Sequence, residues 1–253
     1  MKFTPFCPIC GTTEFVEFNG RPQARCARCG AMERTRLLFG ILNRQGFLAP
    51  GITIWHLAPE PGLAALLRRL AGRYVPSDVA TSKYAAYLPE IQRVDLCDFD
   101  PDALGSFDLI IHMHVLEHIP CAVGPVLHKM GGMLNPGGRM YFSVPIRSAG
   151  ATTEDLDPTL EGSERKARFG QHDHQRIFGK DDALELFRAA LGPSVEEIDP
   201  LRHFSADEIR MMGIVVDVTV LSGHSILCYR RTSGPGRPAA ASGSDAIVPS
   251  ASP

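Results

Sequence analysis

Short runs of β-branched and aromatic residues alternate with helical segments from about residue 46 to residue 231. The run at residues 107–114 is apolar almost to its end, which is typical of a strand buried on both faces of a sheet. A helical pattern follows the first strand, with Pro61 near its beginning and Gly72 at its end. This alternation predicts a parallel, doubly wound α/β sheet with right-handed crossovers.

The other elements follow from the same patterns. A turn at residues 135–138, Asn-Pro-Gly-Gly, is expected to reverse the chain into a strand. Further strands are expected at residues 52–57, 73–76, 139–145 and 224–231 and in a segment ending at Asp95, and further helices at residues 121–134, 181–191 and from the capping box Ser205 to Glu208.

Composition divides the chain into three parts. Residues 1–45 hold two cysteine pairs and most of the early arginines, and residues 46–231 carry the alternating strands and helices. Residues 232–253 are rich in Pro, Gly, Ser and Ala, which predicts a disordered tail. We therefore expect a small N-terminal unit with a linking helix, one α/β domain and a tail.

The overall composition is that of an ordinary globular protein. The 253 residues are 44% hydrophobic and 21% charged, and the net charge is −2. Such a balance gives no global attraction to nucleic acid or to an anionic membrane. No apolar run approaches the roughly 18 residues that span a bilayer, and the first residues lack the apolar core of a signal peptide. Four of the seven cysteines form two tight pairs, while Cys97, Cys121 and Cys228 stand singly. This arrangement is not that of a disulfide framework, so a cytoplasmic location is expected.

The two cysteine pairs form the motif C-x2-C-x15-C-x2-C, made of Cys7, Cys10, Cys26 and Cys29. Each pair is followed by a glycine, which suits a turn with positive φ around a thiolate. Four thiolates are the preferred ligands of a closed Zn²⁺ site. The sequence therefore predicts a zinc ribbon.

The role of this ribbon stays open between two interpretations. It is a structural staple for a segment too small to fold alone, or a surface that binds acceptor substrate, RNA or a second subunit. Through Arg44 the chain has seven basic and three acidic side chains, which is a mild patch and not a phosphate-binding stripe. The apolar side of the following helix predicts that the ribbon is fixed on the main domain; it carries Leu37, Leu38, Ile41 and Leu42.

The carboxyl edge of the predicted sheet gathers the candidate ligand-binding residues, because ligands of open parallel sheets bind there. Asp78 follows the second strand at a distance that suits the two hydroxyls of a ribose. Asp95 follows the third strand and could accept a hydrogen bond from the exocyclic amine of an adenine. The fourth strand leads into His112, His114, Leu116, Glu117 and His118.

These residues resemble the class I S-adenosylmethionine-dependent methyltransferases. The resemblance rests on the loop after the first strand, on the segments around Asp78 and Asp95, and on FDLIIHMHVLEHIP and MLNPGGRMYFSVP, over roughly residues 50–190. It looks closest to a bacterial subgroup with a four-cysteine zinc ribbon ahead of the domain and a GQHDHxRxFG-like segment after the fifth strand, which FGQHDHQRIFG fits. The resemblance implies a Rossmann-like sheet and S-adenosylmethionine as the cofactor.

The loop after the first strand departs from the family pattern of an acid followed by GxGxG. His56 replaces the acid, Ala58 and Glu60 replace the first two glycines, and Gly62 remains. This would damage a pyrophosphate site, where backbone amides approach the phosphates closely. S-adenosylmethionine has no phosphate, and Glu60 could pair with its ammonium group. The expected cofactor-binding residues are His56, Ala58, Glu60, Gly62, Asp78, Asp95, Leu96, His114 and Leu116.

Histidines are the candidate catalytic bases, because a base near neutral pH helps to deprotonate an acceptor OH or NH₃⁺. His172 and His174 lie where the acceptor site of this fold is usually built, and His114 lies under the expected methyl group. The alternatives are that His172-Asp173-His174 is a hydrogen-bonded loop staple or a metal site. His112 and His118 read more readily as packing residues. The polar stretch at residues 147–169 is either a lid over the acceptor or a solvated surface.

The sequence thus predicts methyl transfer to an O or N atom of a small polar acceptor of the sugar or natural-product type. The expected partner is the small-molecule acceptor; nucleic acid and membrane are not expected, and a homodimer stays open. A ribosomal-RNA methyltransferase is one alternative, although no N-P-P-Y-type tetrapeptide follows the fourth strand. A non-catalytic zinc-ribbon binding module is the other.

Overall fold

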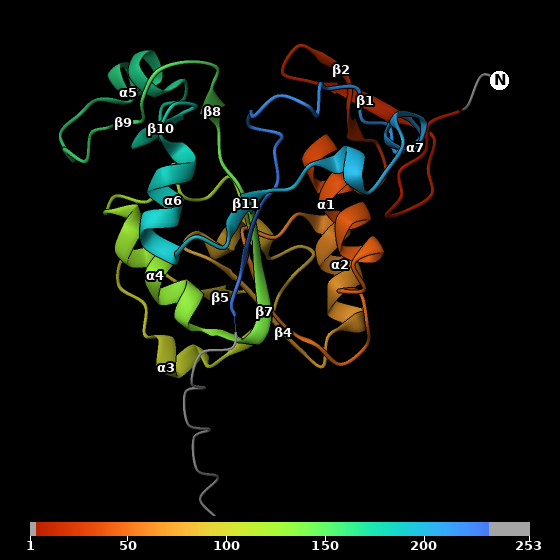
Figure 1. Cartoon of the computed structure of the whole chain (residues 1–253), viewed down its shortest axis with the longest axis horizontal. Helices are drawn as coiled ribbons and strands as arrows, with labels where there is room; N and C mark the ends of the chain where they lie inside the picture. Colours follow the sequence, from red (N-terminus) through yellow and green to blue (C-terminus); the bar gives the residue numbers. More distant parts are fainter. Residues whose placement is uncertain (1–3, 233–253) are drawn as a thin grey trace, which may run out of the picture.

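A seven-stranded sheet forms the centre of the computed structural model, which describes residues 4–232 (Figure 1). Its strand order is β11-β12-β7-β6-β3-β4-β5. The five strands from β7 to β5 are parallel, whereas β12 and β11 are added antiparallel at one edge. The strands are β3 (Thr53–Leu57), β4 (Arg73–Asp78), β5 (Gln92–Arg93), β6 (Phe107–Met113), β7 (Leu134–Ser143), β11 (Val195–Glu197) and β12 (Leu227–Arg230).

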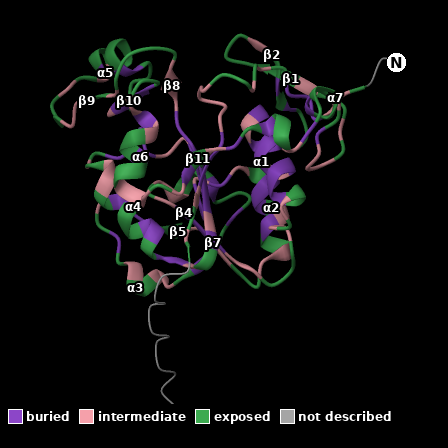
Figure 2. Ribbon diagram, viewed as in Figure 1, coloured by how far each residue is buried: buried purple, intermediate pink, exposed green. Residues whose placement is uncertain are grey.

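Helices cover both faces of the sheet and bury a core on each side (Figures 1 and 2). Strand β6 contributes to both cores, since Leu109 and Ile111 pack with helices α1 and α2 while Ile110 packs with α4 and α6. This confirms the interpretation of residues 107–114 as a strand buried on both faces. The helices are α1 (Glu33–Arg44), α2 (Pro61–Leu70), α3 (Pro101–Leu104), α4 (Val123–Gly132), α6 (Ala183–Leu191) and α7 (Ala206–Met211).

Most expected elements are confirmed, including the capping box of α7, in which Ser205 and Glu208 bond reciprocally. The prediction of a chain-reversing turn at residues 135–138 is wrong. Strand β7 already begins at Leu134, and the ladder with β6 passes from Leu134 to Arg139 across one register shift. The Asn-Pro-Gly-Gly residues form an irregularity inside the strand, since Gly137 takes a φ of 80°. The expected tail lies outside the described residues, apart from Thr232.

The N-terminal cysteine segment is a hairpin of β1 (Phe15–Phe18) and β2 (Arg21–Cys26) that leads into α1. The four apolar residues of α1 named above are buried against the sheet, as the pattern predicts. Arg36 on α1 is fully buried, and it donates to carbonyls of β2, of the loop before α1 and of the turn after α7. Because a buried guanidinium needs all of these acceptors, they hold the hairpin against the domain.

A small three-stranded sheet lies beyond the carboxyl ends of the main strands (Figure 1). It consists of β8 (Ile146–Arg147), β9 (Thr153–Glu154) and β10 (Arg176–Gly179) in the order β8-β10-β9. Helix α5 (Gly162–Phe169) connects β9 to β10. This unit contains the predicted lid segment and the His172-Asp173-His174 segment.

Candidate functional site

A cavity of about 680 Å³ opens at the carboxyl edge of the sheet. Its walls come from the ends of β3, β4 and β6, from the segment after β5 and from the α5–β10 unit. Its lining residues are Leu57, Ala58, Ser77, Asp78, Val79, Lys83, Tyr84, Val94, Asp95, Leu96, His114, Val115, His118, Ile119, Pro120, Arg165, His172, Asp173 and Gln175. The volume lies within the range of small-molecule and cofactor sites.

Two lining residues, Ala58 and His114, have left-handed backbone conformations, with φ of 46° and 57°. Each directly continues a parallel strand: Ala58 N donates to Ser77 O of the next strand, and His114 N donates to Ser143 O. A non-glycine residue in this conformation costs on the order of 1 kcal/mol, and such strain concentrates at functional sites. Ala58 is the residue expected to replace the first glycine of the family pattern, and a left-handed conformation is one that favours glycine.

Asp78 lies at the end of β4 and faces the cavity with its carboxylate fixed on both oxygens. Oδ1 accepts from Ala80 N at 2.7 Å, and Oδ2 accepts from the hydroxyl of Tyr84 at 2.5 Å. Burial and the hydrogen bond to Asp78 raise the pKa of Tyr84, so its hydroxyl stays a donor. Each carboxylate oxygen has a further lone pair for a ligand. The arrangement can therefore accept hydrogen bonds from two neighbouring hydroxyls.

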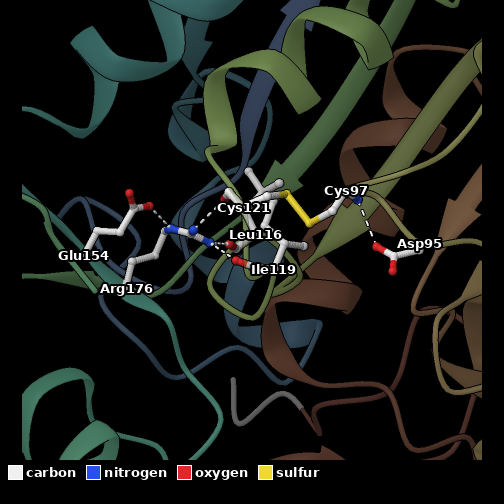
Figure 3. Close-up of a disulfide and its surroundings, with 7 residues drawn as sticks. All are labelled: Asp95, Cys97, Leu116, Ile119, Cys121, Glu154 and Arg176. Carbon is white, nitrogen blue, oxygen red and sulfur yellow. Dashed lines mark hydrogen bonds and ion pairs between the residues drawn. A yellow bond between two sulfur atoms is a disulfide. The ribbon is translucent and has the colours of Figure 1, made fainter. Parts of the chain in front are cut away.

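Asp95 is held in a similar way on the adjoining segment, where its Oδ1 accepts from Cys97 N at 2.9 Å (Figure 3). Cys97 is joined by a disulfide to Cys121 on the loop after β6. The expectation that these two cysteines stand singly is wrong, because the fold brings the ends of β5 and β6 to one edge. Two walls of the cavity are thus covalently linked.

A buried arginine holds the same loop from the other side (Figure 3). Arg176 of β10 donates to the carbonyls of Leu116, Ile119 and Cys121, and to the carboxylate of Glu154. Its side chain is almost fully buried. The arginine of the HDHQR segment therefore positions the cavity wall formed by residues 116–121.

The three candidate bases occupy different positions. His172 is exposed and lines the cavity. His114 also lines it, but its Nε2 donates to Gly223 O and its Nδ1 lies 3.3 Å from Glu117 Oε1. His174 lies behind the wall: its Nδ1 donates to Phe169 O, and burial lowers its pKa.

His112 and His118 separate clearly in the structure. His112 is buried, stacks on Phe142 and has a pKa lowered to about 3 by burial, which confirms the packing interpretation. His118 instead lines the cavity, with Nδ1 3.3 Å from Asp173 Oδ2, and the sequence reading as a packing residue is wrong.

Four of the expected cofactor residues lie outside the cavity lining. His56 is buried within β3, where its Nδ1 is hydrogen-bonded to the Tyr74 hydroxyl of β4. Burial lowers the pKa of His56 to about 3. Leu116 is part of the core behind the wall. Glu60 bonds Arg34 and Thr35 of α1.

Gly62 packs against the cysteine hairpin. A Cβ at this position would lie 2.8 Å from both Cβ and Sγ of Cys29. The contact between α2 and the hairpin therefore requires the remaining glycine of the loop. Glu60, directly before α2, contacts α1 instead of the cavity. Ala58, Asp78, Asp95, Leu96 and His114 are the expected cofactor residues that the fold does bring together.

Several cavity residues escaped the sequence reasoning, chiefly Tyr84, Lys83, Arg165 and Gln175. Tyr84 lies in a short helical turn six residues beyond Asp78, and nothing in its local pattern marks it. Arg165 comes from the expected lid, where it donates to Gln175 Oε1 at 2.6 Å. Nothing in the sequence singles out Arg165, because α5 carries other charged residues beside it and only the structure shows that Arg165 is the buried one.

The four N-terminal cysteines converge as the motif predicts. All four sulfurs lie within 4.8 Å of one another, with 3.6 Å between Cys7 and Cys29 and 3.5 Å between Cys10 and Cys26. Tetrahedral coordination with Zn–S bonds of about 2.3 Å places sulfurs about 3.8 Å apart, so the set fits a zinc ion. The glycines after each pair have φ of 77° and 74°, as the turn requires.

Curated relatives match half of the chain. A ubiquinone biosynthesis O-methyltransferase from Nitrosococcus oceani is 28% identical over 121 residues, which are 47% of this chain and 49% of that protein. The protein of the same name from Marinobacter nauticus is 25% identical over 125 residues, or 48% of this chain and 50% of its own length. The match therefore spans about half the length of these relatives. No protein-family model matches the chain.

Among solved structures, an S-adenosylmethionine-dependent methyltransferase from Mesorhizobium loti superposes with a TM-score of 0.51. It is 16% identical and covers 75% of this chain and 96% of that chain. The chain thus has the Rossmann-like α/β fold of these methyltransferases, with a central, mostly parallel seven-stranded sheet. Within residues 4–232 no helix is both long and apolar enough to cross a lipid bilayer.

The Cys97–Cys121 bond generates a stability prediction. It closes a loop of 24 residues, and a cross-link of this size stabilises by about 3 kcal/mol relative to the open chain. Oxidised protein should lose roughly this free energy of unfolding on reduction by a phosphine, measured by urea denaturation. The double variant Cys97→Ser/Cys121→Ser should not respond to the reductant, whereas Cys228→Ala should respond like wild type. Equal stability of oxidised and reduced wild type would contradict the linkage.

Proposed function

We propose that the protein transfers the methyl group of S-adenosylmethionine to an O or N atom of a small polar acceptor. The observation that carries the proposal is the cavity in which Asp78 and Asp95, from adjacent strand ends, face a wall of histidines. The curated relatives, which are named O-methyltransferases, support the same chemistry and favour oxygen as the accepting atom.

The adenosyl half of the cavity is proposed to lie between β4 and the segment after β5. Asp78, fixed by Ala80 and Tyr84, would accept from the two ribose hydroxyls, and Asp95 would accept from the adenine amine. Leu96 and Val79 supply apolar contacts on the same side. Ala58 lines the cavity at the end of β3 with a left-handed backbone, and its single methyl group leaves room for close approach.

The acceptor half is proposed to lie under α5 and the segment that follows it. When bound, S-adenosylmethionine supplies a methyl group on a positively charged sulfur, which a nucleophile attacks without further activation. The protein then has to align the acceptor and exclude water. The acceptor lone pair would form the new bond to the methyl carbon as the carbon–sulfur bond breaks, and His172 would accept the acceptor proton. His172 is chosen because the second ring nitrogen of His114 faces Glu117, and that of His174 is buried behind the cavity wall.

We also propose that the four cysteines hold a structural Zn²⁺. The sulfur spacing described above supports this, as does the packing of Cys29 against Gly62 of α2. The ion would then fix the hairpin, and the hairpin contacts the beginning of α2. Ala58 lies at the other end of the loop that joins β3 to α2. A cross-linking role of this kind suits a segment too short to bury a core of its own.

Asp78→Asn should weaken S-adenosylmethionine and S-adenosylhomocysteine binding about 10- to 100-fold, because an uncharged amide accepts less strongly from the ribose hydroxyls. Isothermal titration calorimetry measures the effect. Asp98→Asn is the matched control, since this carboxylate is exposed and does not line the cavity. Unchanged affinity in Asp78→Asn would refute the ribose site. Wild type that gives no heat with either ligand at millimolar concentration would refute the enzyme itself.

His172→Asn should lower kcat by about 10²- to 10⁴-fold while cofactor affinity stays near wild type, because a general base contributes about this factor. The assay follows S-adenosylhomocysteine production with an acceptor identified from a panel of hydroxyl and amine compounds. The defect should shrink at high pH, where the acceptor loses its proton to solvent. The exposed His128→Asn is the control. Normal turnover of His172→Asn would exclude it as the base.

Cys26→Ser should release zinc and destabilise the N-terminal hairpin, because three thiolates hold the ion less tightly than four. Wild type is expected to contain about one zinc ion per chain by elemental mass spectrometry. Cys228→Ser removes a cysteine of β12 that lies outside the cluster and should retain this content. Zinc-free wild type, or full zinc content in Cys26→Ser, would contradict the assignment.

A further inference from the structure

Glu117 is a buried carboxylate for which residues 4–232 supply no hydrogen-bond partner. It lies on the loop after β6, is 0% exposed, and neither side-chain oxygen has a partner among the described residues. Two imidazole nitrogens lie within 4 Å of Oε1: His114 Nδ1 at 3.3 Å and His118 Nε2 at 3.9 Å. A charged carboxylate in such a place is costly unless a cation compensates it.

Besides His114, whose other nitrogen donates to Gly223 O, His118 and His174 each place a ring nitrogen near this carboxylate. The ligand atoms of Glu117, His118 and His174 all lie within 4.8 Å of one another. The rings of His118 and His174 meet edge to face, with 4.8 Å between their centroids. One carboxylate and two imidazoles at this spacing can share a single ion.

In each imidazole, the ring nitrogen that points away from Glu117 already has an acceptor. His174 Nδ1 must carry its proton, because it donates to the carbonyl of Phe169 at 3.0 Å. Its Nε2 is consequently a lone pair, and this atom is buried without a partner among residues 4–232. His118 Nδ1 lies 3.3 Å from the carboxylate of Asp173, which leaves its Nε2 on the Glu117 side.

An acceptor on the outer nitrogen is the usual arrangement around metal-binding histidines, since it fixes the tautomer and turns the other nitrogen to the ion. We propose that Glu117, His118 and His174 bind a divalent transition-metal ion at the wall of the cavity. Two imidazoles and a carboxylate suit zinc, iron(II), cobalt(II) or manganese(II) and leave coordination positions open.

The open positions give the site a role in the proposed reaction, and this part rests on the proposed function. His118 and Asp173 line the cavity, so the free side of the ion faces the acceptor half. A divalent ion binds and acidifies a hydroxyl group placed on it. The acceptor would then offer two adjacent oxygens, one of them the hydroxyl that is methylated. An amine acceptor would not need the ion.

The direct test is cobalt binding to the full-length protein with its cysteine site filled by zinc. Co²⁺ in a histidine–carboxylate site gives weak visible bands, whereas Co²⁺ on thiolates adds a strong charge-transfer band, so the two sites are told apart. Wild type should bind about one Co²⁺ per chain in the micromolar range without the thiolate band. Absence of binding up to about 1 mM Co²⁺ would overturn the proposal.

Variants locate the ion. Glu117→Gln keeps the shape of the side chain but removes its charge and should weaken Co²⁺ at least 100-fold. Asp173→Asn, on the exposed loop, should weaken it about 10- to 100-fold, because it removes only the partner of His118. His128→Gln on α4 should bind like wild type. If Glu117→Gln does not fold, Asp173→Asn decides alone, and wild-type affinity in either folded variant overturns the assignment.

Calorimetry with S-adenosylmethionine on the same samples separates this proposal from the proposed function. Wild type that binds the cofactor but no Co²⁺ overturns the metal site alone. Wild type that binds Co²⁺ but no cofactor supports the metal site and contradicts methyl transfer. Retained cofactor affinity in Glu117→Gln together with lost Co²⁺ binding supports both.

Discussion

The parallel pairing of β4, β3 and β6 is the constraint on which the site depends. The register pairs Leu57 of β3 with Ser77 on one side and with His112 on the other, so the three strands end almost level. The ends of the three strands therefore bring Ala58, Asp78 and His114 to the same edge of the sheet, each within one or two residues of this paired position. Burial of these strands on both faces fixes the register, because a slip by one residue would exchange the side chains that fill the two cores and disrupt their packing.

The loops beyond this edge are held by contacts that do not themselves touch a ligand. Arg176 gathers the carbonyls of the loop after β6, and the Cys97–Cys121 bond ties that loop to the segment of Asp95. Because the residues facing the cavity are held by packing and hydrogen bonds, they are preorganised for binding and need little rearrangement. The same loop carries Glu117 and His118, so the proposed ion site and the proposed cofactor site share one support.

Sequence patterns predicted the parts of the fold that follow from local chemistry. Strand β6 is an apolar run, β3 and β4 contain short β-branched or aromatic runs, and the cysteines have a ligand spacing. Asp78 is the last residue of β4, and Asp95 lies two residues beyond β5. The patterns failed where the reason lies in distant residues. Gly62 looked like a cofactor glycine, but its constraint comes from Cys29 in another part of the chain. Cys97 and Cys121 are bonded only because two loops meet, and no spacing rule marks such a pair.

The proposed function depends on an adenosyl group bound between Asp78 and Asp95 at the carboxyl edge of the sheet. A crystal structure of the protein soaked with S-adenosylhomocysteine tests this binding most directly. The ribose hydroxyls are expected on the Asp78 carboxylate and the adenine beside Leu96, with the sulfur toward His114. A cavity that remains filled by side chains, or a ligand bound elsewhere on the molecule, would contradict it.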